Sequence, residues 1–121
     1  MGYIFELKGV NGQLFVDNDY VGIERKGFMG TMTYGHRGRQ EIPYCSIKAV
    51  EVREGTPLIN GFIQFFPIGS EENKEIVFGT LYYENKIIFV SKNNELAMRI
   101  KEFVLNKIRE AEVRQKSKTG V

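Results

Sequence analysis

The segment from Ile42 to Pro67 constrains the fold most, because its pattern predicts a short strand, a longer strand, a turn region and a further strand rich in aromatic residues. Residues 46–54 alternate apolar and polar side chains, and 55–61 are rich in Gly, Pro and Asn. The alternation slips by one residue between Ala49 and Val50, which indicates a β-bulge in a strongly bent sheet. Residues 62–66 have large apolar side chains on both faces, so we expect this strand to be buried on both sides.

Five other segments have strand character and are bounded by turn residues: 13–17, 20–25, 39–42, 75–80 and 86–90. The segments 13–17 and 20–25 are expected to form the first hairpin of the fold, through Asp17-Asn18-Asp19. Residues 1–12 form an N-terminal arm or an extra strand. Residues 27–38 contain four glycines without a clear period, and we read them as a loop whose aromatic residues pack on the rim of the sheet.

The C-terminal part of the chain predicts one amphipathic helix. Its apolar residues fall on one stripe at helical spacing: Leu96, Ile100, Phe103, Val104, Ile108 and Ala111. Asn93 or Asn94 is the expected N-cap. We expect the stripe to seal one open end of the sheets, so that Phe103→Asp should unfold the domain. Residues 1–112 then form one domain, and 113–121, which lack apolar periodicity, form a flexible basic tail.

The bulk composition excludes several classes of protein. With 121 residues the chain fits one domain, and its single cysteine, Cys45, excludes an intramolecular disulfide framework. The single histidine, His36, excludes a His-based metal site, so we expect neither a metal nor a cofactor. No apolar run reaches the length of a membrane span, and the N-terminus lacks secretory-signal features, so we expect a cytoplasmic location.

The charge is unevenly distributed along the chain. Residues 99–121 hold seven Lys and Arg against three Glu, a net charge of +4. Residues 1–98 hold ten basic against twelve acidic residues, a net charge of −2. Nucleic-acid binders concentrate positive charge on the folded surface, so this distribution argues against a nucleic-acid partner.

The order of seven short strands and one capping helix resembles the bacterial pleckstrin-homology-like (PH-like) domains of unknown function. The resemblance rests on Ile42-Pro43, on Asn60-Gly61-Phe62-Ile63-Gln64-Phe65, on the first hairpin and on the helix starting near Glu95. It covers roughly residues 9–111. The resemblance implies a β-sandwich or partly open barrel of about seven antiparallel strands, capped by a C-terminal helix, and leaves the function open.

Eukaryotic relatives of this fold bind phosphoinositides through Lys and Arg in the first hairpin loop. The corresponding loop here is expected to be Asp17-Asn18-Asp19. Two carboxylates in the loop would repel a phosphorylated headgroup. The resemblance therefore implies that the usual lipid site of this fold is absent.

Two groups of residues are candidates for ligand or partner binding. Tyr34, His36, Arg37 and Arg39 lie in or next to a glycine-rich loop that could hold an anion, although a solvated loop tip explains it better. Arg114 and Lys116 belong to the basic C-terminal end. Cys45 lacks an adjacent base, so we expect a part-buried structural cysteine and no catalytic residue.

Three functions remain open from the sequence. The preferred one is a non-catalytic interaction domain that binds a protein or peptide along an open sheet edge, or in a groove between that edge and the helix, or that self-associates. The second is a peripheral membrane adaptor that contacts anionic lipid through the basic helix and tail, a weak interaction without another anchor. The third is a small-ligand-binding barrel or an enzyme, for which no nucleophile–base pair or phosphate-binding motif is present.

Overall fold

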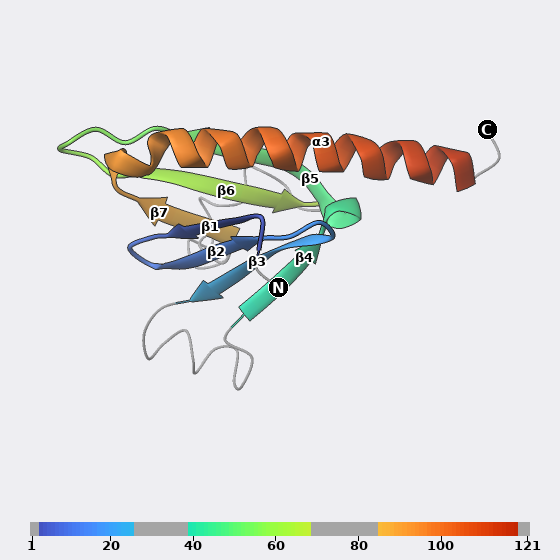
Figure 1. The fold of residues 1–121 in the computed structure, drawn as a ribbon, viewed down its shortest axis with the longest axis horizontal. Coiled ribbons are helices and arrows are strands. Elements are labelled where there is room, and N and C mark those ends of the chain that lie inside the picture. Colours follow the sequence, from blue (N-terminus) through green and yellow to red (C-terminus); the bar gives the residue numbers. More distant parts are fainter. Residues whose placement is uncertain (1–2, 26–38, 69–84, 119–121) are drawn as a thin grey trace.

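The computed structural model describes residues 3–25, 39–68 and 85–118, and these form a mainly β fold with one C-terminal helix (Figure 1). Two antiparallel sheets, of four and three strands, pack together, and the helix runs across them. This arrangement confirms the predicted fold class and is consistent with a PH-like fold.

The first sheet contains β1 (Phe5–Lys8), β2 (Gly12–Val16), β3 (Tyr20–Arg25) and β4 (Arg39–Pro43), each hydrogen-bonded to the next. The opening segment therefore supplies a strand, and the first hairpin is formed by β1 and β2. The antiparallel pairing of β2 with β3 confirms the predicted hairpin of 13–17 with 20–25 through Asp17-Asn18-Asp19. It is the second hairpin of the fold and not the first, because β1 precedes it. The first hairpin instead turns through the uncharged Gly9-Val10-Asn11.

The second sheet contains β5 (Ile47–Arg53), β6 (Gly61–Pro67) and β7 (Lys86–Phe89). The pairing of β5 with β6 shifts register between Ile47 and Ala49, which confirms the predicted bulge. Ile63 to Phe66 are all buried, as expected for a strand covered on both faces. The strand predicted at 75–80 lies outside the described residues.

The core lies between the two sheets and the helix. All seven described strands and the helix contribute apolar side chains to one cluster, and the largest that are fully buried include Phe65, Phe89, Leu7, Leu14, Ile63, Ile87 and Ile100. Phe65 and Phe66 are thus core residues, as the sequence analysis expected, whereas Phe62 is only half-buried.

The outer edge of β7 is joined to the turn between β1 and β2. The Val10 amide donates to the Ile88 carbonyl (2.7 Å). The Asn11 side chain donates to the Lys86 carbonyl (2.8 Å) and accepts from the Ile88 amide (2.9 Å). A side-chain amide thus takes the place of a backbone peptide group in pairing with β7, and it connects the two sheets.

The helix α3 (Asn94–Lys118) follows a short 3-10 turn, η4 (Ser91–Asn93). Ala97, Ile100, Val104, Ile108 and Ala111 are buried, which confirms the amphipathic stripe, while Leu96 and Phe103 are only partly buried. The helix does not end near Glu112 as predicted. It continues because 113–118 contain strong helix formers and no Gly or Pro.

Asn94 does not act as the predicted N-cap. Its side chain instead accepts from the Gly55 amide (2.8 Å) and donates to the Gly55 carbonyl (2.9 Å). The first residue of α3 is thereby fixed to the turn between β5 and β6. A tertiary contact has replaced the local contact that the sequence pattern suggested.

Candidate binding groove

Two adjoining hollows form a groove beside the second half of α3. They share four lining residues: Tyr44, Cys45, Ala111 and Gln115. The larger hollow, of about 370 Å³, also has the apolar residues Ile47, Ile68 and Ile108, together with Glu112. The smaller, of about 220 Å³, is completed by polar groups of Asn18, Asp19 and Arg114, with Pro43. The groove therefore has one apolar and one polar half.

The groove exists because the chain turns sharply after β4. Pro43 has a φ of −68° and ends the strand, and the 3-10 turn η1 (Tyr44–Ser46) follows. The turn places the Tyr44 ring inside the protein, at 4% exposure, and leaves Cys45 exposed between the two hollows. The prediction of a part-buried Cys45 is wrong, because a 3-10 turn presents successive side chains to different sides.

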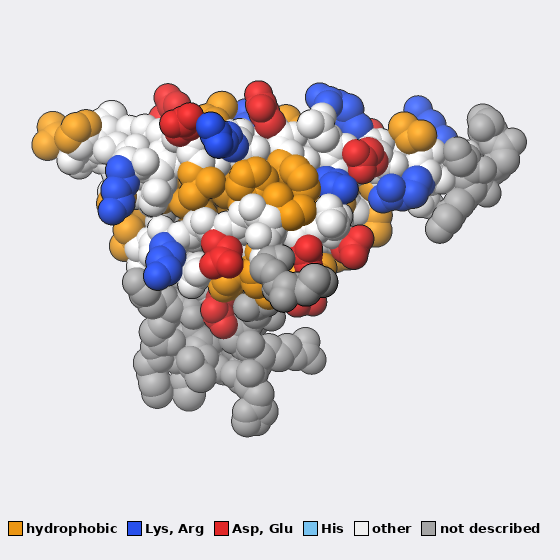
Figure 2. Space-filling view, viewed as in Figure 1, with side chains coloured by type: hydrophobic (Ala, Val, Ile, Leu, Met, Phe, Trp, Pro, Cys, Tyr) orange, Lys and Arg blue, Asp and Glu red, His pale blue; other side chains and the backbone are white. Residues whose placement is uncertain are grey.

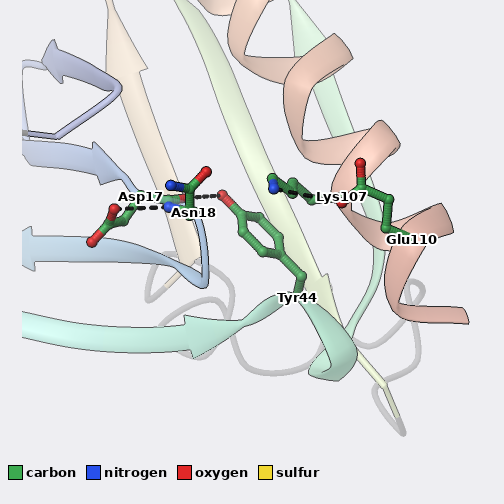
Figure 3. A network of polar contacts seen from close by, with 5 residues as sticks. All are labelled: Asp17, Asn18, Tyr44, Lys107 and Glu110. Atoms are coloured by element: carbon green, nitrogen blue, oxygen red, sulfur yellow. Dashed lines mark hydrogen bonds and ion pairs between the residues drawn. The ribbon is translucent and has the colours of Figure 1, made fainter. Parts of the chain in front are cut away.

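Tyr44 anchors this wall of the groove (Figure 3). Its hydroxyl donates to the Asp17 carbonyl at 2.6 Å, which fixes η1 to the turn between β2 and β3. On its other side the Tyr44 ring meets the Phe103 ring edge to face, with centroids 6.5 Å apart. One side chain thus connects the first sheet to α3.

Lys107 and Glu110, also shown in Figure 3, lie on the part of α3 that faces Tyr44. Their charged groups are 3.5 Å apart, and the Lys107 ammonium lies 5.6 Å from the Phe103 ring centroid. The Glu110 side chain is 55% exposed, so this ion pair adds little to stability. Neither Lys107 nor Glu110 lines the groove.

The environment of Tyr44 raises the pKa of its hydroxyl far above the usual value near 10. Burial is the main cause, and the negative charges of Asp17 and Asp19 add to it. The phenol therefore stays neutral in the folded protein and keeps its donated hydrogen bond.

We predict that this raised pKa makes folding stability fall at alkaline pH. Below about pH 9 Tyr44 is protonated in both states and stability does not depend on its titration. Above about pH 10 only the unfolded state ionises, so the free energy of unfolding should fall by up to about 1.4 kcal/mol per pH unit. Denaturant unfolding of wild type and Tyr44→Phe from pH 8 to 11 would measure this loss. Tyr44→Phe should be about 1 kcal/mol less stable than the wild type at neutral pH, but its free energy of unfolding should fall less as the pH rises. Parallel plots of this free energy against pH for the two proteins would contradict the prediction.

Of the two sequence-predicted site residues whose side chains the structure describes, one lies in the groove. Arg114 lines the polar half, whereas Lys116 is exposed on the same helix and does not line it. Arg39 begins β4, but its side chain lies outside the described residues, as do Tyr34, His36 and Arg37. The anion site predicted from these four residues therefore stays a prediction.

Sequence reasoning missed the apolar half of the groove. The sequence analysis assigned Ile108 and Ala111 to the apolar stripe of the helix. Both lie near the C-terminal end of this stripe, where the sheets no longer cover the helix completely. Pro43 was the available signal, because a proline after a strand marks a change of chain direction.

Two further properties of the described residues bear on the class of site. In 3–25, 39–68 and 85–118 no three His, Cys, Asp or Glu side chains gather into a possible metal site. Within the same ranges α3 is too polar to cross a bilayer.

The two packed sheets and the capping helix define a small β-sandwich domain with a groove beside its helix. Residues 14–105 match the model of a protein family described as a domain of unknown function (DUF4429), which covers most of the chain. The protein therefore belongs to this family. The match begins in β2 and ends within α3, so it includes β3 to β7 and the η1 turn but not β1. No curated protein and no solved structure shows significant similarity to the chain.

Proposed function

We propose that this protein is a non-catalytic, PH-like interaction domain that binds an apolar segment of a protein partner in the groove between η1 and α3. The observation that carries the proposal is the groove itself. Ile47, Ile68 and Ile108 provide apolar contacts, and Asp19 and Arg114 stand at the adjoining polar half. Small sites with an apolar floor and a few polar groups are typical of peptide recognition.

The exposure of Ile68 supports this choice of surface. Ile68 lines the apolar half of the groove and is 63% exposed. Figure 1 shows the C-terminal part of α3 extending past the sheets, so a bound segment would meet the helix without displacing a strand. Apolar side chains at such a position gain free energy when a partner covers them.

The groove is a better candidate than the sheet edge at β7. That edge already pairs with Val10 and with the Asn11 side chain, so an added strand would have to break three hydrogen bonds. The occupant is an extended or helical segment with one or two aliphatic side chains, supplied by another protein or by a second copy of this chain.

The variant Ala111→Arg tests the proposal, because Ala111 lines both hollows and an arginine there would fill them. Light scattering after size-exclusion chromatography over a concentration series would first show whether the wild type self-associates. Peptides selected from a display library on the wild-type protein would then be titrated against both proteins. We expect Ala111→Arg to weaken peptide binding, or dissociate an oligomer, by at least about tenfold.

Met98→Arg is the matched control, since Met98 lies on α3 outside the groove and is 37% exposed. Both variants would be compared by thermal unfolding, because Ala111 is 8% exposed and an arginine there adds volume. Unchanged binding by a folded Ala111→Arg protein, or equal loss in both variants, would reject the groove as the binding site.

A further inference from the structure

A hydrophobic turn projects from the end of the molecule opposite the groove. It joins β5 to β6, and its tip residues Leu58 and Ile59 are 94% and 61% exposed. Figure 1 shows this turn beyond the start of α3, and Figure 2 shows hydrophobic side chains at the same extremity. Two adjacent aliphatic side chains held this far into solvent are unusual for a turn, where polar residues are the rule.

The turn is held in shape by its own hydrogen bonds. The Thr56 amide donates to the Ile59 carbonyl (2.7 Å). The Thr56 hydroxyl oxygen accepts from the amides of Leu58 (3.2 Å) and Ile59 (3.0 Å). Pro57 has no amide hydrogen, and the Gly55 amide is bonded to Asn94. Every backbone N–H from Gly55 to Ile59 is therefore satisfied within the protein.

This hydrogen bonding lowers the cost of moving the tip out of water. An unpaired backbone N–H or C=O group that enters a hydrocarbon phase is strongly unfavourable, so each N–H group that is already paired removes one such penalty. In this turn the amide donors are already paired, and the side chains at the tip are aliphatic. Transfer of the tip would remove apolar surface from water and leave no amide of 55–59 without a partner.

Basic side chains lie at the base of the turn. The Arg53 guanidinium is 3.5 Å from the Asn60 carbonyl oxygen, and it lies over the Phe62 ring at 4.9 Å. The Lys86 ammonium lies over the same ring at 4.3 Å. Lys92, in the η4 turn that precedes Asn94, is exposed. Glu54 and Glu95 are also exposed near this base, which leaves a small positive excess.

We propose that the β5–β6 turn inserts Leu58 and Ile59 into an anionic lipid surface. A convex tip fits a deformable layer, and Arg53, Lys86 and Lys92 are placed to meet lipid headgroups while the aliphatic pair enters the acyl region. This site is separate from the groove, because the two lie at opposite ends of α3. Lipid contact would therefore leave the groove open to a partner.

Co-sedimentation with vesicles tests the proposal. The full chain would be mixed with vesicles of phosphatidylcholine alone and of phosphatidylcholine with an equal amount of phosphatidylserine. The variant Leu58→Gln/Ile59→Thr should bind the anionic vesicles at least about tenfold more weakly than the wild type. Val113→Gln is the matched control, since Val113 is 63% exposed, close to the 61% of Ile59, and should bind as the wild type does.

The absence of tryptophan from the sequence provides a second readout. Leu58→Trp would carry a single indole at the tip, and its emission should shift to shorter wavelength on adding anionic vesicles. Val113→Trp should show no such shift.

Four results would overturn the proposal. The first three are an unchanged emission of Leu58→Trp, equal binding to the two vesicle compositions, and loss of binding in Arg114→Gln/Lys116→Gln but not in Leu58→Gln/Ile59→Thr. The third would place the lipid contact on the helix end instead. A wild type that binds neither composition would also overturn it and would favour a protein pocket as the receptor of the tip.

Discussion

Replacing Ile100 by Asp is expected to leave the protein without a cooperative unfolding transition. Ile100 lies on the buried face of α3 and has no exposed surface. It belongs to the single apolar cluster shared by the helix and both sheets. The change removes the burial of a large aliphatic side chain and places a carboxylate in the cluster without a charged partner. Together these effects should exceed about 5 kcal/mol, which is comparable to the whole stability of a small domain.

Circular dichroism during thermal unfolding would measure this effect. Phe103→Asp is the informative comparison, because the sequence analysis expected that variant to unfold the domain. Phe103 is only partly buried and packs edge to face on Phe5, with ring centroids 5.5 Å apart. The carboxylate of an aspartate at this position could therefore reach water. We expect a loss of about 2–3 kcal/mol there and less than about 1 kcal/mol for the exposed Met98→Asp. A cooperative melt of Ile100→Asp close to wild type would mean that α3 does not seal the core.

Gly61→Ala is expected to cost about 3 kcal/mol or more, a large effect for one methyl group. Gly61 begins β6 and lies directly against the end of β5. A Cβ atom on Gly61 would come within 2.5 Å of the Gly55 nitrogen and 2.9 Å of the Glu54 carbonyl carbon. It would also collide with the Arg53 carbonyl oxygen. All three atoms belong to the backbone, so no side-chain rotation can relieve the contact, and the β5–β6 turn would have to open.

Urea unfolding of Gly61→Ala beside Asn60→Ala would check this prediction. Asn60 is the exposed neighbour of Gly61, so its substitution should change stability by less than about 0.5 kcal/mol. The two variants differ by one position in the chain and add or remove only small groups. Similar stability of both would contradict the close approach of the β5 and β6 backbones.

The strands and the helix could be predicted because their patterns are local. Alternation, or an apolar run bounded by turn residues, identified β2 to β7. The one-residue slip in the alternation of 46–54 indicated the bulge in β5, which lies between Ile47 and Ala49. The helix stripe was equally readable, since Ile100, Val104 and Ile108 recur at helical spacing. These signals depend on the period of the backbone and need no knowledge of the partner surface.

The groove could not be predicted, because it depends on how distant segments meet. η1, the end of α3 and the turn after β2 come together only in the folded chain, and none has a sequence motif that announces a site. Asn94 shows the same limit. Its position suggested a helix cap, but Gly55, 39 residues earlier, competes for its side chain. The exposed pair Leu58-Ile59 was read simply as turn material, because sequence alone does not reveal which aliphatic residues lack cover.

The Asn11 amide has a consequence for the behaviour of the protein at high concentration. Uncapped outer strands invite neighbouring molecules to continue a sheet from one copy to the next, which is how ordered aggregates begin. Here the carbonyl of Lys86 and both backbone groups of Ile88 are already occupied by the chain's own first turn. Fibre growth from that side would first require this turn to detach, so the asparagine protects the molecule against indefinite polymerisation.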